Sequence, residues 1–303
     1  MAEQADAADL KSAEGKPRGG SIPFPGTIFL NGKSGGNIMK IGISALSTGH
    51  LKITEAIKKA RELDFELVEI FGDFLFFDNA PFKETSQEIG RVAKEEGVEL
   101  TIHLPALDLN TGSLNAGIYK LTREENIIAL NFAAEAGVKL AVFHPASAPI
   151  CFQPILEAVE ERMEKLLGDL LVMANSLDIT IAVENLGVEE TWMVNKPDKM
   201  LKLMNTFDSE LKVTLDFGHA YIAKLTQEFI DTLKLHIKHL HLHDNFGFAD
   251  EHLPVGTGSL PYNNYKIFLK GFQGTATMEI FSFKDPINDI KISRENLLRI
   301  LSD

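Results

Sequence analysis

Histidines are concentrated in one short stretch of this chain. Four of the nine histidines lie within "HLHLHDNFGFADEHLPVG", which runs from His239 to Gly256, and His236 lies just upstream. The three histidines of "HLHLH" alternate, so in a β-strand their side chains point to one face. Imidazoles together with carboxylates suit Zn, Mn, Fe or Co. The stretch therefore predicts one wall of a metal site, with its carboxylates supplied by other segments.

The elements that must position these side chains alternate along the chain. Short β-rich runs are each followed by a helical pattern, which favours a parallel sheet buried on both faces. The eight predicted strands are 40–46, 66–71, 98–105, 138–145, 179–186, one within 211–220 that ends at Asp216, 237–245 and 274–282. The predicted helices are 53–63, 86–97, 122–137, 155–177, 196–207, 221–234, 262–272 and 293–301. Thr54 and Thr122 are predicted to cap the first and third helices.

This order predicts an α/β fold, a single-domain (β/α)₈ TIM barrel over residues 39–303. A doubly wound open sheet is the alternative. No Gly-rich dinucleotide fingerprint follows the first strand, which disfavours that alternative.

Six consecutive predicted strands carry a metal-binding type of residue at or near the carboxyl end. In a barrel these ends meet at one mouth, where active sites form. Carboxylates can bridge ions in a multinuclear site, whereas without cations they would repel one another. The sequence therefore predicts a divalent metal site at the mouth. The six residues are His103, His144, Glu184, Asp216, His241 and Glu279.

The histidines differ in how well their positions suit a metal ligand. His241 is near the strand end and is the predicted ligand, whereas His239 is expected deeper in the barrel and His243 beside the ligands. His236 is interpreted as structural and His50 as a solvated loop residue.

Three of four further features keep two interpretations each. Glu69 either lines the mouth or is an ion-paired carboxylate inside the barrel. The aromatic run 71–82 either packs under a loop or covers the substrate. Trp192 either stacks on a sugar or is simply packed, and "GTGS" (256–259) is a weak phosphate-binding pattern.

Composition limits the classes of partner and compartment. The chain is 45% hydrophobic with a net charge of −13, and an acidic surface disfavours phosphate backbones, so nucleic acid is not the expected partner. Cys151 is the single cysteine, which excludes an intramolecular disulfide and favours the reducing cytoplasm. No apolar run approaches the roughly 18 residues that a membrane span requires.

Residues 1–38 differ from the rest because they are small, polar and rich in Ala, Gly and charge. They lack the charged and apolar regions of a secretory signal. We interpret them as a poorly ordered tail or an added leader, and Met39 as the start of the barrel.

Several motifs together carry a family resemblance. "HLP", "FHP", "VENLG", "TLDFGHA", "HLHDN", "DEHLPVGTGSL" and "MEIF" occur in order along residues 39–303. They resemble the xylose isomerase-like barrel superfamily, which includes sugar-phosphate isomerases and epimerases and the endonuclease IV type of apurinic-site nuclease.

The resemblance implies two alternative metal sites. An epimerase-type site would hold one ion with Glu184, Asp216, His241 and Glu279. A nuclease-type site would hold three ions. It would add His103 and His144 to Glu184 for one ion, and His219, Asp250 and His252 for another.

The sequence departs from the nuclease pattern at three places. The nuclease has Asp-Thr-Cys-His where this chain has "DFGH" (216–219), and a basic residue where this chain has Glu251. It also has "HLND" followed by Lys, where this chain has "HLHDNFG".

The leading functional prediction is a metal-dependent isomerase or epimerase of a small sugar or sugar phosphate, hence an enzyme of carbohydrate metabolism. Zn, Mn or Co would stabilise an enediolate, with the number of ions open, while Glu184 and Glu279 exchange a proton from opposite sides. An endonuclease IV-like apurinic-site phosphodiesterase is the first alternative. A non-catalytic barrel that binds metal or a partner protein is the second.

Overall fold

The computed structural model describes residues 39–49, 52–77, 84–208, 210–281 and 284–302. Within them, eight parallel strands pair in sequence order, and β8 pairs back to β1 to close a barrel. This confirms the predicted (β/α)₈ barrel. The strands are β1 Lys40–Ser44, β2 Leu67–Phe71, β3 Glu99–His103, β4 Leu140–Phe143, β5 Thr180–Glu184, β6 Lys212–Asp216, β7 Ile237–Leu242 and β8 Thr275–Met278. The predicted tail, residues 1–38, lies outside the described residues.

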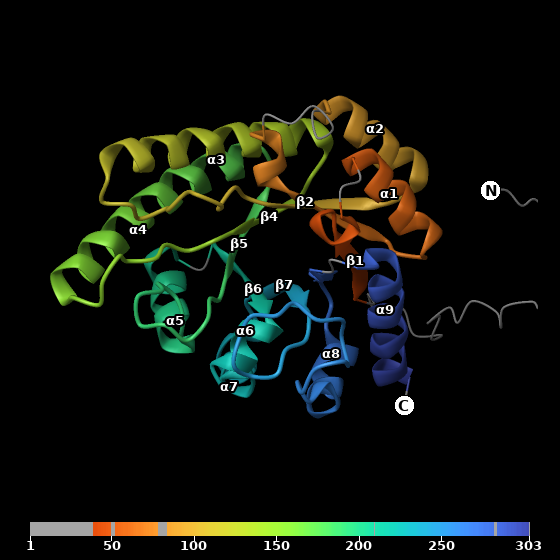
Figure 1. The fold of residues 1–303 in the computed structure, drawn as a ribbon. Helices are drawn as coiled ribbons and strands as arrows, with labels where there is room; N and C mark the ends of the chain where they lie inside the picture. The colour runs from red at the N-terminus through yellow and green to blue at the C-terminus, as the bar shows by residue number, and fades with distance from the viewer. Residues whose placement is uncertain (1–38, 50–51, 78–83, 209, 282–283, 303) are drawn as a thin grey trace, which may run out of the picture. The chain divides into compact units, whose positions relative to one another are not determined.

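Helices follow the strands and surround the barrel (Figure 1). They are α1 Ile53–Glu62, α2 Ser86–Glu96, α3 Ala116–Ala136, α4 Gln153–Ser176, α5 Pro197–Thr206, α6 Phe217–Ile222, α7 Thr226–Leu233, α8 Lys266–Gly271 and α9 Pro286–Ser302. Short 3₁₀ helices occupy η1 Leu46–Thr48, η2 Gly72–Leu75 and η4 Tyr262–Tyr265. Within the described part of the chain, no helix is both long and apolar enough to cross a bilayer.

Two predicted helix caps are wrong for a local reason, although the first helix begins at residue 53 as predicted. Helix α3 begins six residues before Thr122, because the Asn115 side chain accepts hydrogen bonds from the backbone N–H groups of Gly117 and Ile118. The Thr122 hydroxyl instead donates to the Ile118 carbonyl within the helix. Thr54 likewise lies inside α1, where its hydroxyl donates to Glu84.

The predicted helix 221–234 is also divided. Helix α6 starts directly after β6, because Asp216 at the strand end accepts a hydrogen bond from the His219 backbone N–H at 2.7 Å. Lys224 then adopts a positive φ of 59° between α6 and α7. The early helix start brings His219 to the mouth of the barrel.

The two faces of the strands differ in polarity. Apolar residues such as Ile70, Ile102 and Leu240 are fully buried in the continuous core that includes helix residues such as Ile57 and Leu166. The barrel interior is instead polar toward the mouth: Glu69, Thr101, Thr214, His239 and Thr277 have at most 3% of their surface exposed. Buried polar groups need partners or ions, so the interior is built for more than packing.

Candidate metal centre

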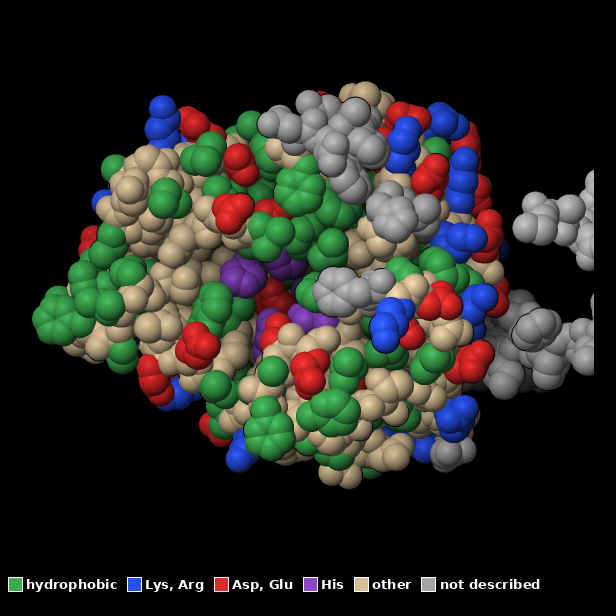
Figure 2. Space-filling view, viewed as in Figure 1, with side chains coloured by type: hydrophobic (Ala, Val, Ile, Leu, Met, Phe, Trp, Pro, Cys, Tyr) green, Lys and Arg blue, Asp and Glu red, His purple; other side chains and the backbone are tan. Residues whose placement is uncertain are grey.

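The carboxyl ends of the strands form a mouth that gathers the predicted site residues. His103, Glu184 and Asp216 are the last residues of β3, β5 and β6, and His144 and Glu279 directly follow β4 and β8. Figure 2 shows histidines at the bottom of a hollow on this face, with Asp and Glu side chains around it. Closure of the barrel thus brings together residues far apart in sequence.

Four of the predicted residues form one buried group, which we call the carboxylate cluster: Glu184, Asp216, His241 and Glu279. One ligand atom from each lies within 4.8 Å of all the others. His241 Nδ1 is 2.9 Å from Glu184 Oε1, 3.3 Å from Glu279 Oε2 and 3.8 Å from Asp216 Oδ2. These four are the residues of the single-metal arrangement expected from the sequence.

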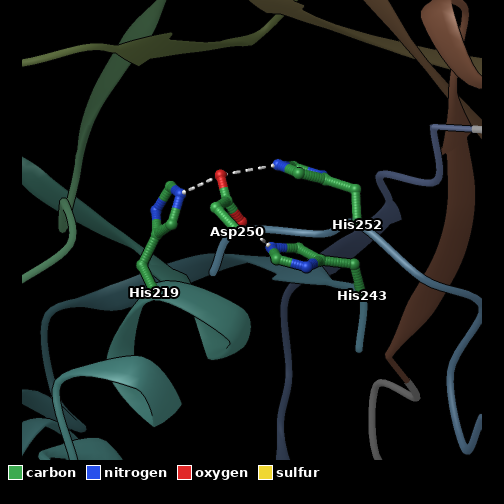
Figure 3. A group of neighbouring side chains, drawn as sticks. All are labelled: His219, His243, Asp250 and His252. Atoms are coloured by element: carbon green, nitrogen blue, oxygen red, sulfur yellow. Dashed lines mark hydrogen bonds and ion pairs between the residues drawn. The ribbon is translucent and has the colours of Figure 1, made fainter. Parts of the chain in front are cut away.

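A second group, the histidine cluster, contains His219, His243, Asp250 and His252 (Figure 3). Asp250 Oδ2 lies 3.1 Å from Nε2 of both His219 and His252. His243 Nε2 is 3.7 Å from Asp250 Oδ1 and 3.2 Å from Asp216 Oδ1. His243 was expected only beside the ligands, and it joins this group because it shares the face of the strand that carries His241.

His103 and His144 are less tightly associated with a group. His103 Nε2 lies 3.4 Å from Glu184 Oε2, and the His103 and His144 ring centroids are 6.0 Å apart. The described residues contain three groups of possible metal ligands, and neither histidine belongs to one of them. Their proposed role with Glu184 at a third ion therefore has less geometric support than the two clusters.

Backbone carbonyls determine which ring nitrogen of four imidazoles carries hydrogen. Nδ1 lies 2.9–3.0 Å from the carbonyl oxygens of Leu104, Pro145, Asn185 and Glu279 in His103, His144, His219 and His252, respectively. A carbonyl can only accept, so Nδ1 donates and the neutral ring presents an Nε2 lone pair. This second contact is typical of metal-binding histidines.

The opposite ring nitrogens of His219 and His252 then face an acceptor. Two lone pairs and one carboxylate oxygen converge at Asp250, and they repel one another unless a cation lies between them. That cation is either a proton or a metal ion. The donor set of imidazole nitrogens and carboxylate oxygens fits a transition metal.

The same requirement for positive charge is seen in the pKa directions. Burial opposes a charged ring, but Glu279, Glu69 and Glu184 outweigh it and raise the pKa of His241 well above its ordinary value. Burial also opposes charge on His103, yet its bond to Glu184 and the nearby carboxylates raise its pKa to about 9. His144 is the exception, because burial lowers its pKa to about 4.

The loop after β7 holds the histidine cluster in place. Asp244 is fully buried and accepts backbone hydrogen bonds from Asn245, Gly256 and Leu260 at 2.8–3.0 Å. His252 has a positive φ of 46°, a conformation that side-chain-bearing residues adopt at a cost. "GTGS" therefore helps to organise this loop, since the Gly256 N–H points to Asp244.

The structure also decides between the alternatives for Glu69 and for part of the aromatic run. Glu69 does not line the mouth but lies inside the barrel, with no exposed surface, against His239 and His241. Phe71 and Phe74 are buried and pack edge to face at 5.4 Å. Residues 78–82 of the aromatic run and His50 lie outside the described residues.

Trp192 lies beside the candidate site. Its ring meets His144 edge-on at 5.8 Å between centroids. A cavity of about 80 Å³ adjoins both side chains and is bordered by Leu109, Asn110 and Ser147.

Comparisons with known proteins agree with this architecture. Residues 57–300 match the family model described as "Xylose isomerase-like TIM barrel". An uncharacterized protein of Methanocaldococcus jannaschii is 31% identical over 210 residues, which cover 69% of this chain and 80% of that protein. Fructoselysine 3-epimerase of Shigella flexneri is 23% identical over 80% of this chain and 90% of that protein.

A solved structure extends the comparison to three dimensions. The "D-tagatose 3-epimerase-like protein" superposes with a TM-score of 0.73 at 26% identity, covering 86% of this chain and 98% of that one.

Proposed function

Because this chain belongs to the xylose isomerase-like TIM-barrel family, we propose that it is a metal-dependent epimerase or isomerase of a small sugar or sugar phosphate. The observation that carries the proposal is the carboxylate cluster. Glu184, at the end of β5, and Glu279, directly after β8, both contact His241 Nδ1, at 2.9 and 3.3 Å. A pair of carboxylates around a cation site is what proton removal and return beside a carbonyl require.

The residues of the carboxylate cluster would hold a divalent ion, with Zn, Mn and Co as candidates. Three carboxylates and one imidazole are buried together there, so a cation would offset their mutual repulsion. When bound, the ion would act as a Lewis acid toward a carbonyl oxygen and stabilise an enediolate.

Glu184 and Glu279 would perform the proton transfers. Burial favours a neutral Glu184, but His241 and His103 outweigh it and lower the pKa of the Glu184 carboxyl well below its ordinary value. Glu184 is therefore unprotonated, as a base must be. Glu184 would remove the proton beside the substrate carbonyl, and Glu279 would deliver one to the opposite face, which inverts that carbon. With the roles reversed the enzyme would work in the other direction.

The compared proteins support the substrate class. The Shigella protein is named as a fructoselysine 3-epimerase, and the superposed structure is named as a protein similar to D-tagatose 3-epimerase. Because inversion beside a carbonyl needs a base and an acid on opposite faces, the two-glutamate arrangement fits this reaction.

The histidine cluster favours a second candidate, an apurinic-site phosphodiesterase. His219, Asp250 and His252 converge as a three-metal site would require, with Glu184, Asp216, His241 and Glu279 gathered nearby. In such an enzyme several ions would stabilise the attacking and leaving oxygens of a phosphodiester.

The proposal predicts a metal-dependent exchange of a substrate C–H proton. We would measure bound metal by elemental analysis and then screen ketoses and ketose phosphates in deuterated water, following deuterium incorporation by mass spectrometry. Glu184→Gln and Glu279→Gln should each reduce the exchange rate by roughly 10²-fold or more. Glu160→Gln is the matched control, because Glu160 pairs with Lys202 on the helical surface, and it should retain the wild-type rate.

Two results would count against this proposal. One is purified protein that holds no transition metal and gains neither activity nor stability from Zn, Mn or Co. The other is exchange that survives in both glutamine variants.

A further inference from the structure

Glu69 is a buried carboxylate directly beneath the carboxylate cluster. It lies on β2, has no exposed surface, and accepts a hydrogen bond from the Thr101 hydroxyl to Oε2 at 2.9 Å. Its two oxygens each meet an imidazole: Oε1 is 3.1 Å from His241 Nε2, and Oε2 is 3.1 Å from His239 Nε2. These contacts cross the barrel interior from β2 to β7.

The contact between Glu69 and His241 Nε2 makes His241 different from the other candidate ligands. In His103, His144, His219 and His252, a backbone carbonyl holds Nδ1, and Nε2 is the nitrogen left for an ion. In His241 the arrangement is reversed, because Nδ1 faces the carboxylate cluster and Nε2 faces Glu69. The partner that sets its orientation is a full negative charge instead of a carbonyl.

Without an ion, the raised pKa of His241 favours hydrogen on both ring nitrogens. With an ion at the carboxylate cluster the ring keeps a single proton, and the contacts place that proton on Nε2. The N–H is not well aligned with Oε1 for a hydrogen bond, but a lone pair at that position would face a carboxylate at 3.1 Å in a dry interior, where repulsion is strong. With the proton on Nε2, the Nδ1 lone pair is available to an ion. The opposite tautomer would place N–H toward Glu184 Oε1, 2.9 Å away, and block coordination.

His239 and Thr275 hold Glu69 in this position. His239 Nε2 faces the carboxylate and carries hydrogen by the same argument, so Nδ1 accepts a hydrogen bond from the Thr275 hydroxyl at 2.6 Å. Thr101 fixes Oε2 from the neighbouring strand. Glu69 is thus contacted from β3 by Thr101 and from β7 by His239 and His241.

We propose that Glu69 is the positioning residue that commits His241 to the tautomer able to bind metal through Nδ1. The proposal rests on the function proposed above only in requiring a metal at the carboxylate cluster. Glu69 itself would touch neither metal nor substrate.

The test is the metal affinity of Glu69→Gln. A glutamine retains the size of the side chain but lacks the charge, and its amide can donate to a His241 Nε2 lone pair. The wrong tautomer then becomes accessible. Competition against a chromophoric chelator should show Zn²⁺ and Mn²⁺ binding weakened by about 10–100-fold.

Thr214→Val is the matched control for this measurement. The Thr214 hydroxyl is also buried and has no hydrogen-bond partner among the described residues. It lies on β6, the strand that pairs with the β7 strand of His241. The control should bind both ions within about twofold of wild type, since valine replaces an unpaired hydroxyl at nearly equal volume. Similar loss of affinity in both variants would contradict a specific role for Glu69.

A second measurement uses the wild-type protein and needs no variant to fold. In Zn²⁺-loaded protein labelled with ¹⁵N-histidine, NMR should show the His241 ring proton on Nε2. A proton on Nδ1, or a folded Glu69→Gln with wild-type metal affinity, would overturn the proposal. If Glu69→Gln does not fold, Thr101→Val, which removes the donor that holds Oε2, should weaken binding in the same direction.

The two proposals can fail separately. Wild-type protein that loads metal with the Nε2 proton but exchanges no substrate proton would refute the epimerase function and leave the role of Glu69 intact. If Glu69→Gln exchanges the substrate proton at the wild-type rate and also binds metal with wild-type affinity, only the role of Glu69 would be refuted.

Discussion

At the scale of single residues, five of the six imidazoles at the mouth are oriented by the partner of their second nitrogen; for His243, no hydrogen-bond partner of Nδ1 lies among the described residues. Carbonyl groups hold four of them and Glu69 holds His241. The ligand-type nitrogens consequently point inward before any ion binds. Such preorganisation reduces the cost of ordering the site when metal enters.

His144 provides a prediction about pH. Burial lowers its pKa to about 4 in the folded protein, against 6.5 for an ordinary histidine. The unfolded chain therefore binds a proton in this window and the folded chain does not, so stability is complete above pH 6.5 and is lost as pH falls toward 4. In chelator-treated protein, urea unfolding at pH 6.5 and pH 5 should show wild type losing roughly 1 kcal/mol more than His144→Gln. Equal losses would show that His144 titrates normally.

Individual site residues could be predicted unequally well. Glu184, Asp216 and Glu279 were found because the strand-end rule depends only on where a strand stops. For Glu69 two interpretations stayed open, and His243 was expected only beside the ligands, because their neighbours come from strands on other sides of the barrel. Alternation in the sequence shows which face a side chain shares, and it does not show how deep it lies or what it meets.

At the scale of elements, the loop after β7 depends on Asp244. Its carboxylate accepts three backbone hydrogen bonds in a fully buried setting. Asp244→Ala should lower the free energy of unfolding by roughly 3 kcal/mol, because buried donors lose a charged acceptor. It should also weaken any metal bound at the histidine cluster, which this loop carries.

Unfolding in urea and metal titration would check this prediction. Thr257→Val is the control, since the exposed Thr257 hydroxyl donates only to Pro254 in the same loop. It should change stability by about 0.5 kcal/mol or less. Unaltered metal binding in a folded Asp244→Ala protein would show that the loop holds its shape without the carboxylate.

Element types were easier to predict than element ends. Each strand is a short β-rich run followed by a helical pattern, so all eight were found. The start of α3 was missed because Asn115 caps it through a local side-chain contact, while the strong capping-box pattern at Thr122 lies inside the helix. The end of β6 at Asp216 was predicted, but helix α6 was missed, because Asp216 both ends β6 and caps α6.

At the scale of the whole molecule, the barrel follows from the order of its elements, whereas the two clusters follow from its closure. Periodicity predicts eight strand–helix units and right-handed connections predict their arrangement. Strand register is set by packing between neighbours, and register decides that His241 lies beside Asp216. No pattern within one segment contains that information.

Net charge decides the expected behaviour toward nucleic acid. The chain carries a net charge of −13, and Glu251, between Asp250 and His252, is exposed with its carboxylate on the Phe246 backbone N–H. A nuclease must neutralise several phosphates, and its affinity then falls by about 10³–10⁵ between 50 and 200 mM salt. We therefore expect no measurable binding to a duplex with an apurinic site at either salt concentration, and negligible incision of it.

His252→Ala separates the two candidate functions in the same metal-loaded protein. If the carboxylate cluster alone performs the proposed proton exchange, this variant should retain most of that activity, because His252 belongs to the histidine cluster. If the protein is a phosphodiesterase, the variant should lose incision, since one ion would lack a ligand. Robust incision by wild type that disappears in His252→Ala would replace the epimerase proposal with the multinuclear one, and the acidic charge of the chain would then have to be offset at the mouth by the bound ions themselves.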